Sequence, residues 1–305
     1  MHIATNKYLR VIAKPLLVFT RWFGRHYPEQ LVRIRYLARF KKKLNLDTPK
    51  TLNEKILWCE LRGDTSLWTK LADKYAVRDY LIQKGYAENL VKLYGVWDKA
   101  SDIDFDSLPN RFVLKTAHGS GDIIVIKDKT KMDAQSVRKT MDKNIKQVYG
   151  ELEGGLHYMR IKGRAIAEEL LINDEFSSRY SSSLIDYKIW CFNGKAHYVW
   201  VCVDRNSGTA KVMTYDRDWN AHPEYCAITQ DFSLAAPMPC PKNYEEMLKM
   251  AEDLAAPFPV VRVDLYNLNG KIYFGEMTFT SLGGMMDFYS DEFQNMCGEI
   301  IQLPK

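Results

Sequence analysis

Two runs near the end of the chain place charged residues where they could act on one substrate. Arg262 and Asp264 stand two positions apart in an apolar, strand-like run. Glu276 and Thr278 repeat this spacing in the next run. Alternate residues of a strand point to the same face, so each pair shares a face. Because a short Asn-Gly turn joins the two runs, we expect antiparallel pairing that brings Asp264 close to Glu276.

This grouping of side chains suits phosphate chemistry. Two carboxylates and a hydroxyl on adjacent strands can hold Mg²⁺ against nucleotide phosphates. Arg262 beside them could stabilise the charge on a phosphoryl group during its transfer. The alternative is structural, a surface salt bridge between Arg262 and one acid. Apolar residues on the other face of both strands favour the functional interpretation.

A small glycine-containing loop earlier in the chain could hold an anion. An apolar run, 112–115, ends in Lys115, the loop His118-Gly119-Ser120-Gly121 follows, and a β-branched run covers 123–126. Glycines let backbone N–H groups approach a phosphate closely, and Lys115 adds a positive charge beside them. The alternative is an ordinary hairpin with a lysine at its mouth.

Other nucleotide signals are weaker. Neither the GxxxxGK[ST] pattern nor a GxGxxG opening a helix is present, which argues against the two commonest glycine-rich phosphate motifs. Glu168 and Glu169 end an apolar strand-like run, 166–171, and such a position can meet the edge of an adenine. The alternative, which the sequence favours equally, is that both are solvent-exposed acids at a strand end with no role in binding. Lys211 is a weaker candidate for a further phosphate lysine.

Composition and cysteine usage exclude several classes. The 305 residues are 46% hydrophobic and 27% charged, which fits one large domain or two closely associated ones. The six cysteines form no CxxC pair, which argues against a zinc ribbon, a redox dithiol or a disulfide framework and suits a reducing cytoplasm. Since no apolar run reaches 18 residues, the sequence predicts no membrane-spanning helix.

The positive charge of the chain is concentrated at its beginning. Residues 1–55 carry a net charge of +10, whereas the remaining residues carry −5. Residues 1–44 have a helical pattern in which cations alternate with aromatic and aliphatic residues, and Pro15 and Pro28 are each expected near a helix start. Such a helix can lie on an anionic membrane surface. The alternative is a helical pair packed on the body, and no motif indicates nucleic acid.

The elements that must position these residues follow from the pattern of the chain. Thr51-Leu52-Asn53-Glu54 fits a capping box that opens a helix over 52–61. A second helix is expected over 71–84, with Lys74 near its start. Asn193-Gly194 and Asn269-Gly270 predict hairpins. Helices are further expected over 133–149, 244–256 and 291–303, strands over 90–97, 164–171, 184–192, 195–203, 211–215, 260–266 and 271–277, and a lid-like loop over 150–163. The fold class expected is α+β, with a mainly antiparallel sheet.

The order of these features resembles that of ATP-grasp enzymes. Several phrases are similar, more narrowly, to the TupA-like ATP-grasp family of teichuronopeptide and surface-polysaccharide biosynthesis. The similar phrases are TKLADKYAV (69–77), FDSLPNRFVLK (105–115), HGSG (118–121), DYK (186–188) with NGK (193–195), and 258–274 with the following Gly-Glu. The resemblance covers about 52–304.

The resemblance implies an ATP-grasp fold, two α+β subdomains with the nucleotide between them. A basic helical segment, 1–50, would precede a catalytic region, 51–305. Within that region the resemblance implies an N-terminal part (51–110), a small lid subdomain (111–165) and a large C-terminal subdomain (166–305).

The resemblance also implies a role for each site residue toward ATP. Lys74 and Lys115 are similar to the two lysines that contact the phosphates. The flexible loop that closes over them corresponds to His118, Gly119, Ser120 and Gly121. The adenine-binding hinge corresponds to Glu168 and to the backbone of Glu169 to Leu171.

The remaining correspondences concern the metal and the ribose. Asp264 and Glu276 match the acids that bind Mg²⁺, and Arg262 matches the arginine that stabilises the transferred phosphate. Thr278 is a departure, because the family usually has asparagine there, although a hydroxyl can still ligate Mg²⁺. Asp186 and Lys188 occupy a strand where a ribose-contacting acid often lies.

The activity implied is ATP-dependent carboxylate–amine ligation through an acyl phosphate. The expected substrates are a uronic acid carboxyl of a bacterial surface polysaccharide and an amino acid or amine. A glycosyltransferase of capsule or cell-surface polysaccharide synthesis, an ATP-dependent glycan kinase and a non-catalytic glycan- or membrane-binding module remain alternatives. The expected place is the cytoplasm, with peripheral contact through 1–44 at the inner face of the membrane or with a polyanionic glycan.

Overall fold

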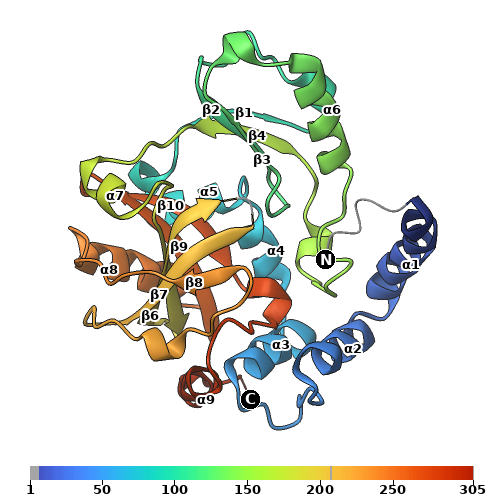
Figure 1. Cartoon of the computed structure of the whole chain (residues 1–305), viewed down its shortest axis with the longest axis vertical. Coiled ribbons are helices and arrows are strands. Elements are labelled where there is room, and N and C mark those ends of the chain that lie inside the picture. Colours follow the sequence, from blue (N-terminus) through green and yellow to red (C-terminus); the bar gives the residue numbers. More distant parts are fainter. Residues whose placement is uncertain (1–6, 207, 305) are drawn as a thin grey trace.

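Two separate β-sheets form the framework of the protein (Figure 1). The computed structural model describes residues 7–206 and 208–304. The helices are α1 (Lys7–His26), α2 (Pro28–Phe40), α3 (Leu52–Arg62), α4 (Ser66–Ala72), α5 (Val77–Gln83), α6 (Ala134–Ile145), α7 (Glu175–Tyr180), α8 (Tyr244–Ala255) and α9 (Asp291–Ile300). The strands are β1 (Leu93–Trp97), β2 (Phe112–Thr116), β3 (Ile123–Ile126), β4 (Ala165–Glu169), β5 (Asp186–Phe192), β6 (Lys195–Asn206), β7 (Thr209–Asp216), β8 (Phe232–Leu234), β9 (Val260–Leu268) and β10 (Lys271–Thr278). The predicted α+β class is confirmed.

The smaller sheet carries the glycine-containing loop. Its strands run antiparallel in the order β1-β4-β2-β3, and α6 packs on it. Phe112 and Leu114 of β2 point into a core that also contains Val137 and Met141 of α6. The predicted hairpin is present, because Lys115 pairs with Ile123 across β2 and β3. The loop 117–122 therefore forms the closed end of this hairpin, where it joins the two strands.

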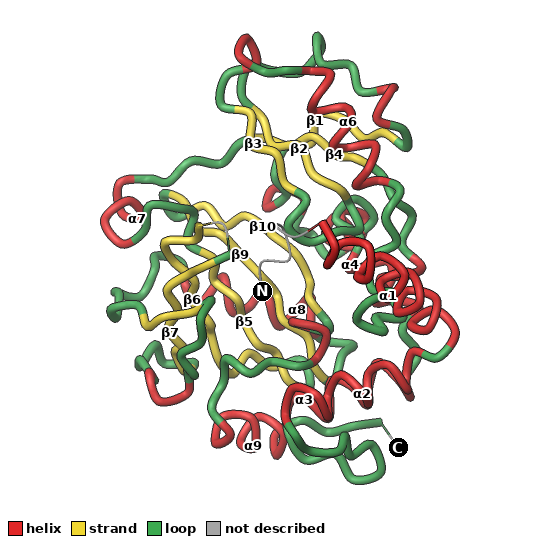
Figure 2. The backbone as a smooth tube through the Cα atoms, turned by 45° about the vertical axis from the view of Figure 1, so that its right-hand side comes forward, coloured by secondary structure: helices red, strands yellow, loops and turns green. Residues whose placement is uncertain are grey.

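The larger sheet carries the acidic strands. Its order is β10-β9-β5-β6-β7-β8, antiparallel except for the parallel pair β7–β8. Helix α8 buries Met247, Leu248, Ala251 and Leu254 in the core of this sheet. In the tube view the two sheets stand at different heights, with α3, α2 and α1 running along one side of the molecule (Figure 2).

Two tight turns fix the register of the large sheet. Asn193 and Gly194 have φ angles of 49° and 76°, and Asn269 and Gly270 have 55° and 81°. Positive φ at both central positions is the hairpin geometry that Asn-Gly favours, so both predicted hairpins are confirmed. A register shift between Phe274 and Glu276 then places Glu276 opposite Asp264.

The prediction of a single helix over 71–84 is wrong, because the helical conformation is interrupted between α4 and α5. The Asp73 carboxylate accepts the N–H groups of Tyr75 and Ala76, at 2.8 and 3.2 Å. Such side-chain bonds to nearby backbone compete with helix continuation. The N–H of Lys74 instead donates to the carbonyl of Ala117, at 3.0 Å. The break therefore presents Lys74 to the glycine-containing loop.

Other elements differ in smaller ways. The capping box is confirmed, because Thr51 accepts from the N–H of Glu54 and the Glu54 carboxylate accepts from the N–H of Thr51. Pro28 opens α2 as expected, but Pro15 lies inside α1, which starts at Lys7 well before it. The short elements α7 and β8 were not expected.

Candidate active site

The predicted pairing of the acidic strands is present. Asp264 of β9 lies opposite Glu276 of β10, and Arg262 lies opposite Thr278. The bulge that sets this register favours a glycine, because a Cβ at Gly275 would lie in tight contact, 3.0 Å from the carbonyl oxygen of Asp264. These four side chains therefore share one face of the large sheet.

Asp264 is held by two cations in the interior. Arg262 donates Nε to Oδ1 at 2.7 Å and Nη2 to Oδ2 at 2.8 Å, and Lys188 Nζ lies 2.6 Å from Oδ2. All three side chains are buried. Burial alone would lower the pKa of Arg262, but the Asp264 carboxylate raises it above its usual range. The two-pronged contact fixes the position of the Asp264 carboxylate.

Arg262 is also fixed by hydroxyl groups. Its Nη1 donates to Ser281 Oγ at 2.5 Å, and its Nη2 donates to Thr278 Oγ1 at 3.1 Å. The nearest Glu276 oxygen lies 3.9 Å from Nη2. The guanidinium is therefore oriented before any substrate arrives, and Thr278 contributes to that orientation.

Glu276 is the accessible acid of the cluster. Its side chain is 39% exposed, and Oε2 lies 3.6 Å from Lys74 Nζ. Burial would raise the pKa of Glu276, but the charges of Lys74, Lys188, Arg262 and Arg205 lower it to about 2. The carboxylate is therefore ionised throughout the physiological range.

Lys74 links the two sheets at this point. Besides facing Glu276 on the large sheet, its Nζ donates to the carbonyl of Gly119 at 2.7 Å. A Cβ at Gly119 would clash with the Asp122 carboxylate and the Thr116 hydroxyl. Those two groups are hydrogen-bonded to each other at 3.0 Å, so the loop is tightly packed here.

The other loop residues have different surroundings. His118 is buried, with Nε2 2.8 Å from the carbonyl of Gln147, so it ties the loop to the segment after α6. Ser120 is exposed at the tip. Gly121 has φ of +79° and open space around its Cα, so its glycine serves backbone conformation.

Lys115 reaches the predicted adenine-hinge acid. Its Nζ lies 2.6 Å from Glu168 Oε2, and Arg78 Nη1 lies 3.4 Å from the other oxygen of Glu168. The Glu169 side chain is exposed, and Leu171 is half-buried. The structure thus places the Glu168 side chain on Lys115, and the contact of this strand end with adenine stays a prediction.

Asp186 and Lys188 extend the buried charges along β5. Arg205 Nη1 lies 3.0 Å from Asp186 Oδ2, and Lys188 Nζ lies 3.6 Å from Asp186 Oδ1. Burial would lower the pKa of Lys188, but Asp186 and Asp264 raise it. An alternating chain of charges therefore runs from Arg205 to Arg262. In this structure Asp186 and Lys188 support Asp264, and their contact with ribose stays a prediction.

Two tyrosines at the site were not predicted. Burial raises the pKa of Tyr158, and the Glu276 charge raises it further. Tyr149 is affected in the same way by burial and by the charges of Glu153 and Glu276. The two rings meet edge to face with centroids 5.1 Å apart. They stand on either side of the glycine-rich loop 150–157. This position beside the loop was the feature of the sequence that could have indicated them as site residues.

The residues present fit a magnesium ion. The Glu276 side chain is partly exposed, and Asp264 Oδ1 accepts a hydrogen bond only from Arg262 among the described residues. Carboxylate and hydroxyl oxygens are the hard ligands that Mg²⁺ prefers, and Thr278 supplies a hydroxyl. Within 7–206 and 208–304, no group of three or more His, Cys, Asp or Glu residues could hold a metal. The remaining ligands would therefore come from water and substrate phosphate, which is usual for Mg²⁺.

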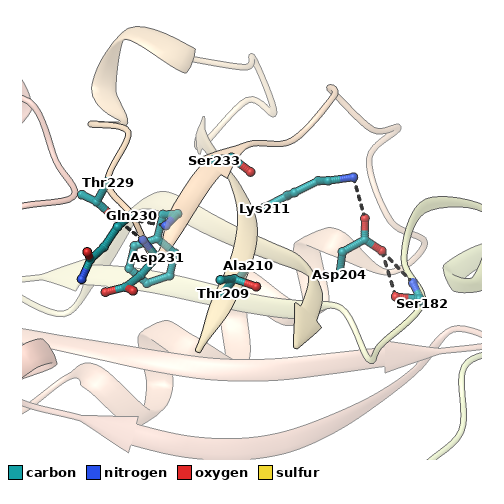
Figure 3. A pocket seen from close by; sticks show the side chains of 10 residues that line it. Ser182, Asp204, Thr209, Ala210, Lys211, Thr229, Gln230, Asp231 and Ser233 are labelled. Atoms are coloured by element: carbon teal, nitrogen blue, oxygen red, sulfur yellow. Dashed lines mark hydrogen bonds and ion pairs between the residues drawn. The ribbon is translucent and has the colours of Figure 1, made fainter. Parts of the chain in front are cut away.

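A separate polar cavity of about 430 Å³ lies at the β7–β8 edge of the large sheet (Figure 3). Lys211 lines it and is ion-paired with Asp204 at 3.0 Å. Ser182 donates to the same carboxylate. The structure therefore does not bring Lys211 together with Lys74 and Lys115.

Comparison with known proteins gives one family match. The family model described as TupA-like ATPgrasp matches residues 54–302. A search of curated proteins gives no match.

Solved structures give distant similarities. D-alanine–D-alanine ligase from Bacillus anthracis has 14% identity and a TM-score of 0.45, covering 76% of this chain and 63% of that chain. The ADP complex of N5-carboxyaminoimidazole ribonucleotide synthetase has 13% identity and a TM-score of 0.44, covering 74% of this chain and 50% of that chain. L-amino acid ligase from Bacillus licheniformis has 12% identity and a TM-score of 0.41, covering 70% of this chain and 41% of that chain. The chain thus spans less than two thirds of the length of each.

The family model covers most of the chain, from the capped helix α3 to the residues after α9. It includes every residue of the cluster described above. The predicted resemblance is thereby confirmed. The chain belongs to the TupA-like ATP-grasp family and has the ATP-grasp fold.

Proposed function

We propose that the protein is an ATP-dependent carboxylate–amine ligase that works through an acyl phosphate. One observation carries the proposal: Lys74 contacts the Gly119 carbonyl of one sheet and faces the Glu276 carboxylate of the other. A polyphosphate bound beside Lys74 would therefore meet the glycine-containing loop on one side and the metal-binding acids on the other. This arrangement supports transfer of a terminal phosphoryl group.

The first step would join the substrate carboxylate to the γ-phosphorus of ATP. A carboxylate oxygen attacks, the bond to the β,γ-bridging oxygen breaks, and ADP leaves. ATP bound with Mg²⁺ supplies the phosphoryl group in this step. Lys74 and Lys115 would neutralise phosphate oxygens, and Arg262 would stabilise the charge that develops on the transferred group. Asp264 and Glu276 would hold the ion.

The second step would form the amide. A neutral amine attacks the acyl carbon, the bond to the phosphate oxygen breaks, and inorganic phosphate leaves with the amine proton passing to solvent or phosphate. No protein nucleophile is required. Closure of the loop 118–121 over the phosphates would exclude water, which otherwise hydrolyses the acyl phosphate.

The acceptor we propose is a uronic acid carboxyl of a bacterial surface polysaccharide, joined to an amino acid or another amine. This choice is supported by the resemblance of the chain to a family of surface-polysaccharide biosynthesis.

The test is a screen of uronic acid glycans and amines for ADP release by the purified protein with Mg²⁺ and ATP. We expect ADP only when both substrates are present, and a product whose mass is that of an amide. Glu276→Gln serves as the inactive control. A phosphorylated glycan would support the kinase instead, and consumption of a nucleotide sugar without ADP release from ATP would support the glycosyltransferase.

A further inference from the structure

Helix α1 turns an apolar stripe toward the solvent. The stripe consists of Leu16, Val18, Phe19 and Trp22, with exposed fractions of 64, 67, 56 and 47%. Leu16 and Phe19, Phe19 and Trp22, and Val18 and Trp22 each stand three or four positions apart, so together they cover one broad side of the helix. The rings of Phe19 and Trp22 lie 5.9 Å apart. Contiguous exposed apolar side chains of this kind mark an interaction surface.

The C-terminal half of α1 is fixed to the body of the protein. Gly24 packs so closely on the carbonyl of Glu151 that a Cβ would clash with it. Arg25 forms an ion pair with the buried Glu151 carboxylate, and Arg21 Nε lies 3.9 Å from the same group. The stripe is therefore held outward, at the edge of the molecule where α1 stands in Figure 1.

The segment that carries the stripe, from α1 through the end of α2, is rich in positive charge. Residues 15–44 contain eight Lys and Arg residues and a single acid, Glu29. Lys41, Lys42 and Lys43, which follow α2, are all exposed. Two copies of the chain meeting through α1 would bring like charges together, which opposes association. An anionic lipid surface meets both requirements, since aromatic rings enter the headgroup boundary while the cations contact phosphates.

We propose that the apolar stripe of α1, with the cations of the same segment, docks the protein on an anionic lipid bilayer. In 7–206 and 208–304, no helix has the length and apolar character needed to cross a bilayer, so the contact is with the surface. The net charge of −5 on residues 56–305 is repelled by such a surface, which orients the N-terminal helices toward it.

This orientation brings the segment 151–153 toward the lipid. The segment that α1 contacts through Glu151 continues to Glu153, whose side chain lies against Gly283, just after β10. Arg35 of α2 holds the same segment by donating to the carbonyl of Leu152 at 2.6 Å. The docking proposal itself does not depend on the proposed reaction, because lipid binding needs neither ATP nor an acceptor.

The test is co-sedimentation of the full chain with vesicles. Vesicles of phosphatidylcholine alone are compared with vesicles that also contain phosphatidylglycerol. We expect binding to the anionic vesicles, weakening as salt is raised. Phe19→Ser and Trp22→Ser should each reduce the partition coefficient about tenfold or more, because each removes an aromatic ring from the interface. Ile228→Ser, at a position 69% exposed outside the N-terminal helices, is the matched control and should bind like the wild type.

The controls make each outcome decisive. Both aromatic positions are largely solvent-exposed, so unchanged circular dichroism and thermal unfolding are expected for the variants. Equal binding of wild type and Trp22→Ser would overturn the proposal, as would equal binding to neutral and anionic vesicles. A wild-type dimer that Trp22→Ser converts to a monomer, without vesicle binding, would show that the stripe covers a second copy instead.

Discussion

Converting the carboxylate of Asp264 or of Glu276 to its amide should abolish activity in both cases but should affect folding stability differently. Both substitutions, Asp264→Asn and Glu276→Gln, remove one negative charge and keep the shape of the side chain. Both should abolish Mg²⁺-dependent ADP release, because the two acids are the candidate metal ligands. Their effects on folding should differ, because Asp264 is buried and Glu276 is 39% exposed.

The size of the difference follows from the contacts. Each oxygen of Asp264 accepts from a cation, Oδ1 from Arg262 and Oδ2 from Arg262 and Lys188. In either orientation an asparagine would turn its NH₂ group toward one of these donors. Breaking a buried ion pair by removing one partner lowers the free energy of unfolding by about 3–5 kcal/mol. Glu276 has ion contacts of 3.6 and 3.9 Å in a partly solvated position, so its change should be about 0–1 kcal/mol.

Equilibrium unfolding in urea, followed by tryptophan fluorescence, measures both variants beside the wild type. With a slope of about 3 kcal/mol per molar urea, Asp264→Asn should move the midpoint down by about 1 M or more. Glu276→Gln should move it hardly at all while ADP release is lost. The reasoning is refuted if Glu276→Gln unfolds as early as Asp264→Asn, or if Asp264→Asn keeps the wild-type midpoint.

Three further predictions concern the phosphate loop, its lysine and the N-terminal helices. Gly119→Ala should raise the KM for ATP about tenfold or more, because the added methyl clashes with a neighbouring carboxylate. Gly121→Ala strains a backbone of positive φ but meets no neighbouring atom, so it should raise the KM less, and steady-state kinetics at varied ATP compare the two variants. Lys74→Met should weaken ATP binding about tenfold in a fluorescent-nucleotide titration, with little change in thermal unfolding. Glu29→Gln should lower the free energy of unfolding by about 1 kcal/mol at neutral pH, because two arginines lower the pKa of Glu29 from 4.5 to about 2. The Glu29 contribution is fully present above pH 4.5 and is lost as the pH falls through about 2, so urea unfolding at several pH values should show the two proteins converging there.

The acidic cluster could be predicted from sequence because its geometry is local. Residues i and i+2 of a strand share a face, and Asn269-Gly270 dictates a two-residue turn. These two rules bring Asp264 and Glu276 together without any knowledge of the rest of the chain. The same holds for the hairpin that carries Lys115, whose strands are separated by a short loop.

The break between α4 and α5 could not be predicted in this way. The apolar spacing over 71–84 continues through Lys74 and favours one helix. What ends α4 is a carboxylate, Asp73, that takes two backbone N–H groups, together with a bond from Lys74 to Ala117 far along the chain. Tyr149 and Tyr158 could not be predicted as site residues for a similar reason. Their position near Glu276 depends on how the loop 150–157 packs, which is a contact between distant parts of the chain.

The buried charges beside Asp264 are better explained by positioning than by stability. Apolar residues of similar volume often stabilise an interior as well as a buried ion pair does, so folding alone does not require Lys188 and Asp186 on this strand of the sheet. The pairs do fix Asp264 and Arg262 in one arrangement, with Glu276 left as the accessible acid. A phosphoryl group arriving between Lys74 and Arg262 would then meet charges that need no rearrangement, which is how an enzyme of this fold gains most from electrostatics. The break between α4 and α5 fits the same logic, because it lets Lys74 contact both the loop of one sheet and the acid of the other.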